Sequence, residues 1–388
     1  MRSAASVPIR TGGNRLLRPL GKFRDFDGYM LFTTMVIMAF GIVAIASASG
    51  IETLGLSNQG VRQAMLGAVG LVLCLIVSTI DYRLIASASW VFYWLGVGAL
   101  VAVLIPGIGA EIQGGRRWFD LGFVTLQPSE FAKITTALAL AHFISTRKDQ
   151  LASFGTFVLS ILIVAIPMGL IAAEPDFDST LTFGVIWASM MLVSRPRKLH
   201  LAMLAAAVPV AAVLTYQFVL RDFHRARILA FLGFQSDALG LDFQQDQAAI
   251  SVGSGGLFGN GLFGGTPSQF NLLSVRTSDF VFAHASSMFG FVGMMALLIC
   301  YVILLLRFLR VVEIARDGFG QCFAVAMTGV ITFQAFINIG MNLGIVPVAG
   351  IPLPFVSAGV SSLWAFLIAV GILQSILMHH RKIAFQPD

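Results

Sequence analysis

Long unbroken blocks of apolar residues recur along this chain and are separated by shorter polar segments that contain most of its charges. The blocks show neither the two-residue alternation of a half-buried strand nor the one-sided stripe of a soluble helix. A helix needs about 20 mostly apolar residues to cross the hydrocarbon core of a membrane. The pattern predicts an all-α integral membrane protein with about ten transmembrane helices, at residues 28–49, 61–80, 84–106, 128–146, 152–173, 178–194, 199–220, 283–308, 319–346 and 359–378.

Composition supports a single membrane domain at residues 28–379, between a basic cytoplasmic tail at 1–27 and a short cytoplasmic tail at 380–388. Of the 388 residues, 57% are hydrophobic and only 11% are charged, whereas a typical soluble protein has about 25% charged residues. The three cysteines lie inside apolar blocks and the six histidines are scattered, so neither a disulfide framework nor a metal site is indicated. The net charge of +6 does not indicate a nucleic-acid partner, and membrane lipids are the expected surroundings.

The basic residues indicate how the predicted helices are oriented. Cytoplasmic segments of membrane proteins carry an excess of lysine and arginine. Most of the 25 basic residues fall on the inside when both chain termini are placed in the cytoplasm. The outer side nevertheless receives a second group of basic residues and most of the 19 carboxylates. Charges of both signs on one face are expected of a site that binds a large anionic amphiphile.

A first outer segment combines Arg116, Arg117 and Trp118 with the helix that follows them. Glu130 and Lys133 lie three residues apart on that helix, so their side chains share one face near the edge of the hydrocarbon core. Ionisable groups inside a membrane are costly and therefore indicate function. Two alternatives stay open. The Glu–Lys pair could serve only packing, and Arg117 with Trp118 could serve only as an anchor in the headgroup zone.

Two further outer segments are candidates for ligand contact. Residues 174–178 place three carboxylates within five residues, a cluster that could bind a divalent cation, hold basic side chains in place or simply be solvated. The predicted long extracytoplasmic loop, at 221–282, is rich in glycine between 253 and 265, which permits tight turns and close backbone approach to a ligand. Because this loop is long and apolar, we expect it to pack back onto the helices.

A fourth segment contains Pro347, Pro352 and Pro354 and continues to Ser357. Three prolines within eight residues exclude a helix. Non-helical backbone at membrane depth is tolerated only inside the protein or beside a cavity. We therefore predict a re-entrant, proline-rich loop that lines the same outer cavity.

Taken in chain order, these segments resemble the signature of the SEDS family, which includes RodA, FtsW and sporulation relatives such as SpoVE. The resemblance runs from residue 28 to the C-terminus. It rests on an ordered set of short motifs: Arg116-Arg117-Trp118, Gln127-Pro128-Ser129-Glu130-Phe131-Ala132-Lys133, Pro175-Asp176, Gly253-Ser254-Gly255-Gly256-Leu257, Ser268-Gln269, Asp279-Phe280, Asn338-Ile339-Gly340, Pro352-Leu353-Pro354-Phe355-Val356-Ser357 and Ser361-Ser362. Several motifs depart from the family pattern; the nearest to the aspartate is Ser274-Val275-Arg276-Thr277-Ser278, which stands where the family has Pro-Glu-x-His-Thr.

The resemblance implies a ten-helix fold in the cytoplasmic membrane of a bacterium, with both termini cytoplasmic. It implies a peptidoglycan glycosyltransferase that polymerises lipid II, an undecaprenyl-pyrophosphate-linked disaccharide-pentapeptide, on the outer face for cell-wall elongation or division. The expected protein partner is a class B penicillin-binding protein, which is a transpeptidase. The essential acidic residue of the family maps to Asp279, the predicted catalytic residue.

The implied reaction suits the residue types in these segments. A carboxylate can take the proton of the acceptor sugar hydroxyl, and arginine, lysine or a metal ion can neutralise the pyrophosphate leaving group. No metal ligand is assigned, and a divalent cation, Mg²⁺ or Mn²⁺, is the one cofactor left open. The residues predicted to bind substrate are Arg116, Arg117, Trp118, Glu130, Lys133, Asp176, Ser268, Gln269, Arg276 and Ser357.

Two other functions are open to test. A flippase or other transporter of lipid-linked precursors should show inverted repeats and ionisable groups near the bilayer midplane. This chain has no clear internal repeat, and its charges cluster at the outer edge. A non-catalytic scaffold of a cell-wall synthesis complex would tolerate the loss of Asp279 and keep partner binding.

Overall fold

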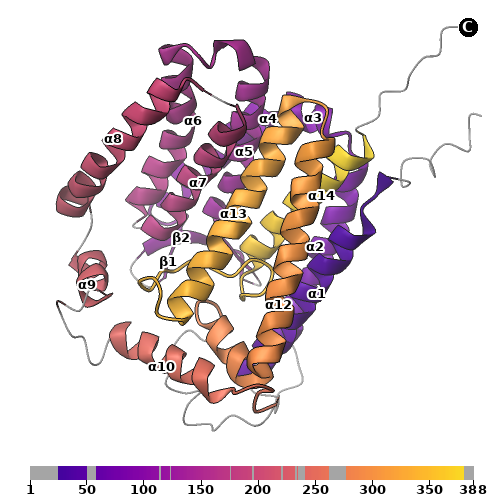
Figure 1. Ribbon diagram of the computed structural model, residues 1–388, viewed down its shortest axis with the longest axis vertical. Coiled ribbons are helices and arrows are strands. Elements are labelled where there is room, and N and C mark those ends of the chain that lie inside the picture. The colour runs from indigo at the N-terminus through magenta and orange to yellow at the C-terminus, as the bar shows by residue number, and fades with distance from the viewer. Residues whose placement is uncertain are drawn as a thin grey trace, which may run out of the picture.

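The computed structural model describes residues 25–49, 58–112, 115–122, 124–174, 176–194, 196–219, 222–231, 234, 241–261 and 277–379. Within these residues the chain is mostly helical (Figure 1). The two predicted tails lie outside the described residues, apart from residues 25–27.

Eight helices among the described residues are long and apolar enough to cross a membrane. They are α1 (Gly28–Ala48), α2 (Gln59–Thr79), α6 (Phe154–Ala173), α7 (Phe177–Ser194), α8 (Lys198–Leu214) with the π-helical turn at Thr215–Val219, α12 (Val281–Ile314), α13 (Gly318–Asn342) and α14 (Val360–Met378). Two more helices occupy predicted spans: α4 (Ser89–Leu104), which follows the short α3 (Tyr82–Ser87), and α5 (Pro128–Thr146). The prediction of an all-α membrane protein with about ten helices is therefore confirmed.

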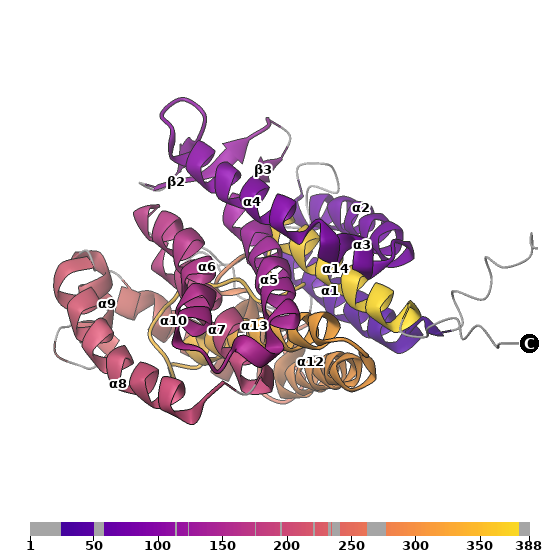
Figure 2. The ribbon, with the colours of Figure 1, turned by 90° about the horizontal axis from the view of Figure 1, so that it is seen from above.

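The helices form one bundle (Figures 1 and 2), in which α5 and α14 are the most buried of the long helices. α5 packs against α4, α6, α7, α13 and α14. Because other helices surround it in place of lipid, α5 can carry charged and small residues and is not among the eight strongly apolar helices. α8 lies at the edge of the bundle in both views, and its surface is mostly exposed.

Successive spans run in opposite directions, so α1 begins and α14 ends at the same end of the bundle (Figure 1). This end is termed the terminal face. The opposite end carries α9 (Asp222–Phe231), α10 (Leu241–Ser254) and a small sheet, and it is termed the α10 face. An even number of membrane crossings returns the chain to the side on which it started. The common location of the start of α1 and the end of α14 therefore agrees with the ten predicted spans.

The α10 face contains two features that the hydrophobic pattern did not predict. Strands β1 (Ala110–Ile112), β2 (Gly115–Asp120) and β3 (Thr125–Leu126) form a three-stranded antiparallel sheet between α4 and α5 in the chain. The predicted loop at 221–282 contains α9 and α10, so it is a partly helical segment.

The glycine-rich part of this segment contacts the protein's own backbone. A Cβ on Gly255 would come within 2.1 Å of the Ser286 carbonyl oxygen in α12. Gly290 has a φ of 63° and kinks α12, and the next amide, Phe291 N, donates to the Gly256 carbonyl at 2.9 Å. These glycines therefore allow a close backbone approach, as expected, and the partner they approach is the backbone of α12.

The proline-rich segment at 343–359 is non-helical and packs into the bundle at the α10 face, as predicted (Figure 1). Buried backbone of this kind needs internal hydrogen-bond partners, and side chains of neighbouring helices supply them. Asn338 Nδ2 donates to the Ile351 carbonyl at 2.8 Å, and Gln63 Nε2 donates to the Ser357 carbonyl at 3.3 Å.

Candidate active site

Asp279 lies in a turn at the α10 face, directly before α12, and the proline-rich loop holds the backbone of this turn. Ala358 N donates to the Thr277 carbonyl at 2.9 Å, and Ser357 Oγ donates to the Ser278 carbonyl at 2.6 Å. Ser357, which was predicted to bind substrate, therefore supports the turn that carries the predicted catalytic residue.

Two asparagines of α13 hold the same turn from the other side. The side-chain amides of Asn338 and Asn342 each donate to the Asp279 carbonyl at 3.1 Å. Asn342 Oδ1 also accepts from Ala283 N, at the start of α12, at 3.2 Å. Both asparagines are completely buried. The backbone of Asp279 is thus fixed by buried groups, which is the kind of support that a catalytic side chain requires.

The Asp279 side chain is half-buried and lies among charges of both signs. The pKa of this carboxyl is raised from 3.8 to about 6, mainly by burial. The nearby Asp178 and Asp176 also raise the pKa, whereas a hydrogen bond from Ser278 and the charge of Arg227 lower it. A carboxylate whose pKa lies close to the working pH is suited to accept a proton and to release it again.

Arg227, on α9, joins that helix to α7 and to the proline-rich loop. Its NH1 lies 3.6 Å from Asp178 Oδ2 and donates to the Val348 carbonyl at 3.3 Å. The same Asp178 oxygen accepts from Gly350 N at 2.7 Å. Burial lowers the pKa of Arg227, and Arg117 contributes in the same direction, whereas the neighbouring carboxylates raise it. The positive charge of the Arg117 guanidinium therefore interacts electrostatically with Arg227.

Arg117, on β2, reaches the C-terminal end of α6. Its Nε donates to the Glu174 carbonyl at 2.9 Å, and its guanidinium carbon lies 6.0 Å from the centre of the Trp118 ring. The Glu174 side chain is only 1% exposed. Burial, reinforced by Asp176 and opposed by Arg117, raises the pKa of Glu174 to about 8. Glu174 is therefore mainly protonated at neutral pH, and this segment carries less negative charge than its sequence indicates.

Asp176 acts as the cap of α7. Ser179 N donates to its Oδ1 at 3.1 Å, and Gln127 Nε2 donates to its Oδ2 at 3.3 Å. Across the described part of the chain, no group of three or more histidine, cysteine, aspartate or glutamate side chains is arranged to hold a metal ion. Of the three alternatives for residues 174–178, this geometry supports the one in which the carboxylates hold other side chains in place.

Glu130 and Lys133 form a buried ion pair inside α5. Lys133 Nζ donates to Glu130 Oε1 at 2.8 Å, and the side chains of Lys133 and Glu130 are 2% and 3% exposed, respectively. Lys133 Nζ also lies 5.9 Å from the centre of the Phe366 ring. Glu130 Oε2 has no hydrogen-bond partner among the described residues. The pair is therefore enclosed between helices, and one of its acceptor atoms is unused.

The other predicted residues lie further out or outside the described residues. Arg116 pairs with Glu111 at 3.3 Å on the surface of the sheet, with both side chains well exposed. Ser268, Gln269 and Arg276 lie outside the described residues. The residue-level prediction did not include Arg227, Asp178, Asn338 and Asn342. Asp178 and Arg227 belong to the charged groups of the outer side, and Asn338 belongs to the Asn338-Ile339-Gly340 motif, whereas Asn342 lies in none of the motifs.

An apolar cavity of about 560 Å³ adjoins this site. Its walls come from α6, α7, α13 and the proline-rich loop, with Thr215 contributed by the turn after α8. Arg227 and Asp178 are its charged lining residues. A hydrocarbon-lined space next to paired charges suits a ligand that has a lipid tail and an anionic head.

Fold and site together define a multi-pass membrane protein whose supported carboxylate, Asp279, interacts electrostatically with the charged residues that line an apolar cavity. The family model for FtsW, RodA and SpoVE, described as "Cell cycle protein", matches residues 28–382. The chain therefore belongs to the FtsW/RodA/SpoVE family, as its motifs predicted.

Relatives of this family align with nearly the whole chain. The peptidoglycan glycosyltransferase MrdB of Escherichia coli (strain K12) is 32% identical over 362 residues, which cover 92% of this chain and 95% of the relative. Stage V sporulation protein E of Bacillus subtilis is 32% identical over 363 residues, covering 92% and 98%. A chain in a solved peptidoglycan synthase complex, described for its coordination of polymerization and crosslinking, superposes with a TM-score of 0.77 at 27% identity, covering 93% of this chain and 99% of that one.

Proposed function

We propose that this protein is a peptidoglycan glycosyltransferase that polymerises lipid II at its α10 face. One observation carries the proposal: Asp279 is held by buried hydrogen bonds and interacts electrostatically with Arg227 and Asp178, which line an apolar cavity. Family membership supports the reaction, because the relative MrdB is named a peptidoglycan glycosyltransferase.

The reaction assigns a role to each part of the site. The acceptor sugar hydroxyl gives its proton to the Asp279 carboxylate while its oxygen forms a bond to the anomeric carbon of the donor. The bond from that carbon to the pyrophosphate oxygen breaks, and the pyrophosphate leaves with the electron pair. Arg227 and Arg117 stabilise the charge that develops on this leaving group. Direct displacement at an α-linked donor gives a β-linked product.

The surroundings of the site support an amphiphilic substrate and a site at the surface of a membrane. The polyprenyl tail would occupy the cavity between α6, α7 and α13, whose lining is mostly hydrocarbon. The α10 face would be extracytoplasmic and the terminal face cytoplasmic, as the distribution of basic residues indicates. A class B penicillin-binding protein would be the partner, in keeping with the synthase complex that contains a similar chain.

Arg227→Gln should lower lipid II polymerisation by about 10- to 100-fold, since a hydrogen bond to a charged group contributes roughly 1.5–3 kcal/mol. The measurement is gel analysis of glycan strands formed from fluorescent lipid II by the purified protein, with and without its transpeptidase. Arg225→Gln is the matched control, because it removes the same charge from α9 at a residue that bonds the Tyr216 and Gln217 carbonyls. If the unmutated protein binds its partner but forms no strands, it is a scaffold and the enzyme proposal fails.

Asn342→Leu should slow polymerisation by about 10- to 100-fold while lipid II binding changes little. The substitution removes one of the two side-chain donors to the Asp279 carbonyl and the acceptor of Ala283 N, and small misplacements of a catalytic group have effects of this size. A split between kcat and KM measures the effect. Thr332→Val, on an exposed part of α13, is the control and should leave both constants unchanged.

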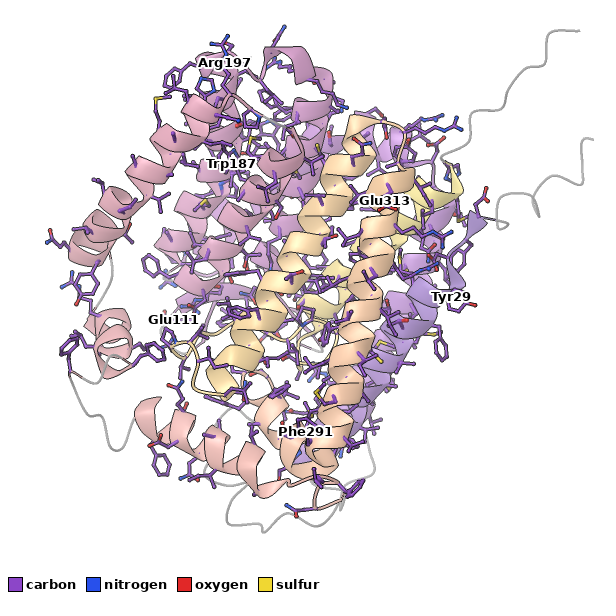
Figure 3. The ribbon with its side chains drawn as sticks, viewed as in Figure 1. Tyr29, Glu111, Trp187, Arg197, Phe291 and Glu313 are labelled. Atoms are coloured by element: carbon purple, nitrogen blue, oxygen red, sulfur yellow. The ribbon has the colours of Figure 1, made fainter. Side chains whose placement is uncertain are left out.

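The orientation is tested by cysteine labelling in intact cells with a membrane-impermeant maleimide, starting from a variant without its three native cysteines. A cysteine replacing Leu121, which is 64% exposed in the segment between β2 and β3, should react directly. A cysteine replacing Glu313, which Figure 3 places at the terminal face, should react only after permeabilisation. The reverse pattern would place the proposed site in the cytoplasm and overturn the assignment.

A further inference from the structure

A second pocket, of about 500 Å³, lies between the first turn of α6 and the first turn of α8. Phe154 and Thr156 of α6 line it together with Ser153, the residue before that helix. His200 of α8 lines it together with Arg197, the residue before α8. Figure 3 places Arg197 at the end of the bundle opposite Phe291 and α10. The pocket is therefore remote from Asp279 and has no part in the proposed reaction.

His200, a lining residue of this pocket, carries a buried polar atom without a partner among the described residues. Its side chain is 4% exposed, and its ring packs against Phe154 and Phe157 with centroid distances of 5.9 and 4.9 Å. Among the described residues, the buried Nδ1 atom has no hydrogen-bond partner. Leaving a buried polar atom unpaired is costly, so such an atom in the wall of a pocket indicates a ligand that pairs with it.

The groups around this pocket also give it a positive electrostatic potential. The 20-residue α6 and the 17-residue α8 both begin here, and the N-terminal end of a helix carries partial positive charge and free amides. Ser153 precedes α6 without making a side-chain capping bond. Arg197 is exposed and makes no side-chain hydrogen bond or ion pair with the described residues. Two helix N-termini, one guanidinium and one imidazole nitrogen together favour an anion with several acceptor oxygens.

We propose that this pocket binds a phosphate group, supplied either by an anionic phospholipid of the adjacent leaflet or by soluble phosphate. Both sources present the same acceptor oxygens to Arg197, His200 Nδ1 and the first amides of α6. The start of a membrane-spanning helix lies at headgroup level, so a lipid phosphate is within reach. The inference is independent of the proposed glycosyltransferase reaction.

Phosphate binding has a consequence for α8. Among the residues of α8 whose burial is described, His200 is the one that is buried. The contact of His200 with Phe157 therefore anchors a helix that is otherwise largely exposed (Figure 1). A ligand bridging His200 and the first turn of α6 should hold this end of α8 in place and slow its amide hydrogen exchange.

The test uses the full chain, purified in a phosphate-free maltoside detergent and stripped of lipid. Inorganic phosphate or short-chain phosphatidylglycerol is added at constant ionic strength, and binding and hydrogen exchange across residues 198–210 are measured. We expect at least one of the two additives to bind and to slow exchange in the unmutated protein. Binding of phosphate alone identifies the soluble source, and binding of phosphatidylglycerol alone identifies the headgroup.

Variants distinguish binding at this specific pocket from nonspecific binding to surface charge. Arg197→Gln and His200→Phe should each weaken binding about tenfold or more, and the phenylalanine preserves the aromatic packing on Phe157. Lys198→Gln removes the same charge one residue further on, outside the pocket lining, and should leave binding unchanged. The proposal is overturned if neither additive binds, or if Lys198→Gln weakens binding as much as Arg197→Gln does. Arg197 is exposed, so its variant remains informative even if His200→Phe does not fold.

Discussion

Asp279→Asn should reduce lipid II polymerisation below detection in a gel assay of glycan strands. The substitution keeps the size of the side chain but removes its ability to accept a proton, and general acid–base catalysis typically contributes about 10²–10⁴-fold. The hydrogen bonds from Asn338, Asn342 and Ser357 go to backbone carbonyls of the turn, which the variant retains. Expression, membrane insertion and partner binding should therefore persist.

Asp120→Asn is the matched control for this variant. Asp120 ends β2 at the same face of the molecule, and its side chain is exposed. Its loss should leave polymerisation within about twofold of the unmutated protein, since surface substitutions away from a site have small effects. Normal polymerisation by Asp279→Asn would move the base elsewhere, with Asp176 and Glu130 the next residues to test.

The pH dependence of the reaction gives an independent signature of Asp279. The base must be ionised, so the rate should rise with pH through about 6 and level off above it, in line with the raised pKa of this carboxyl. Arg227 lowers the pKa of Asp279. Arg227→Gln should therefore shift the rising part of the profile to higher pH, in addition to reducing the maximal rate. A merely structural role of Arg227 would lower the rate without moving the profile.

The membrane helices could be predicted from the sequence because apolar length is a local property of the chain. Even α5 was found, although Glu130 and Lys133 lie in it and its neighbours are mainly other helices. The small sheet was missed because its strands have two to six residues, too few for an alternating pattern to be recognised. α9 and α10 were missed because their sequences are too polar for a membrane span and the glycines that follow them are typical of a loop.

The site was predicted in part. The residues that were not predicted are defined by tertiary contacts between distant segments of the chain. Asp279 was identified through the family motif. The pattern of hydrophobic residues around it in the sequence does not by itself indicate a catalytic residue. The contacts of Asp178 with Arg227 and Gly350 join segments far apart in the chain, so no local spacing reveals them. Ser357 lies in a recognised motif, yet its hydroxyl bonds the Ser278 carbonyl. Motif membership thus located important residues without separating substrate contacts from groups that position the turn.

Lys133→Met should lower the free energy of unfolding by about 3–5 kcal/mol, the usual cost of leaving one member of a buried ion pair without its partner. Glu130 would lose the donor at 2.8 Å, and its other oxygen already has no partner among the described residues. The free energy is measured by denaturant unfolding in detergent. Arg116→Ala breaks the exposed pair with Glu111 and should change the free energy by less than about 1 kcal/mol.

The double variant Glu130→Leu/Lys133→Met then separates packing from function. Replacing both charges by apolar side chains removes the unpaired carboxylate, so stability should return to within about 1 kcal/mol of the unmutated protein. If the pair also binds substrate, as the sequence predicts, this stable variant should still polymerise lipid II at least about tenfold more slowly, since it lacks a charged hydrogen-bonding group. Full polymerisation by the double variant would show that Glu130 and Lys133 serve only to hold α5 in the bundle.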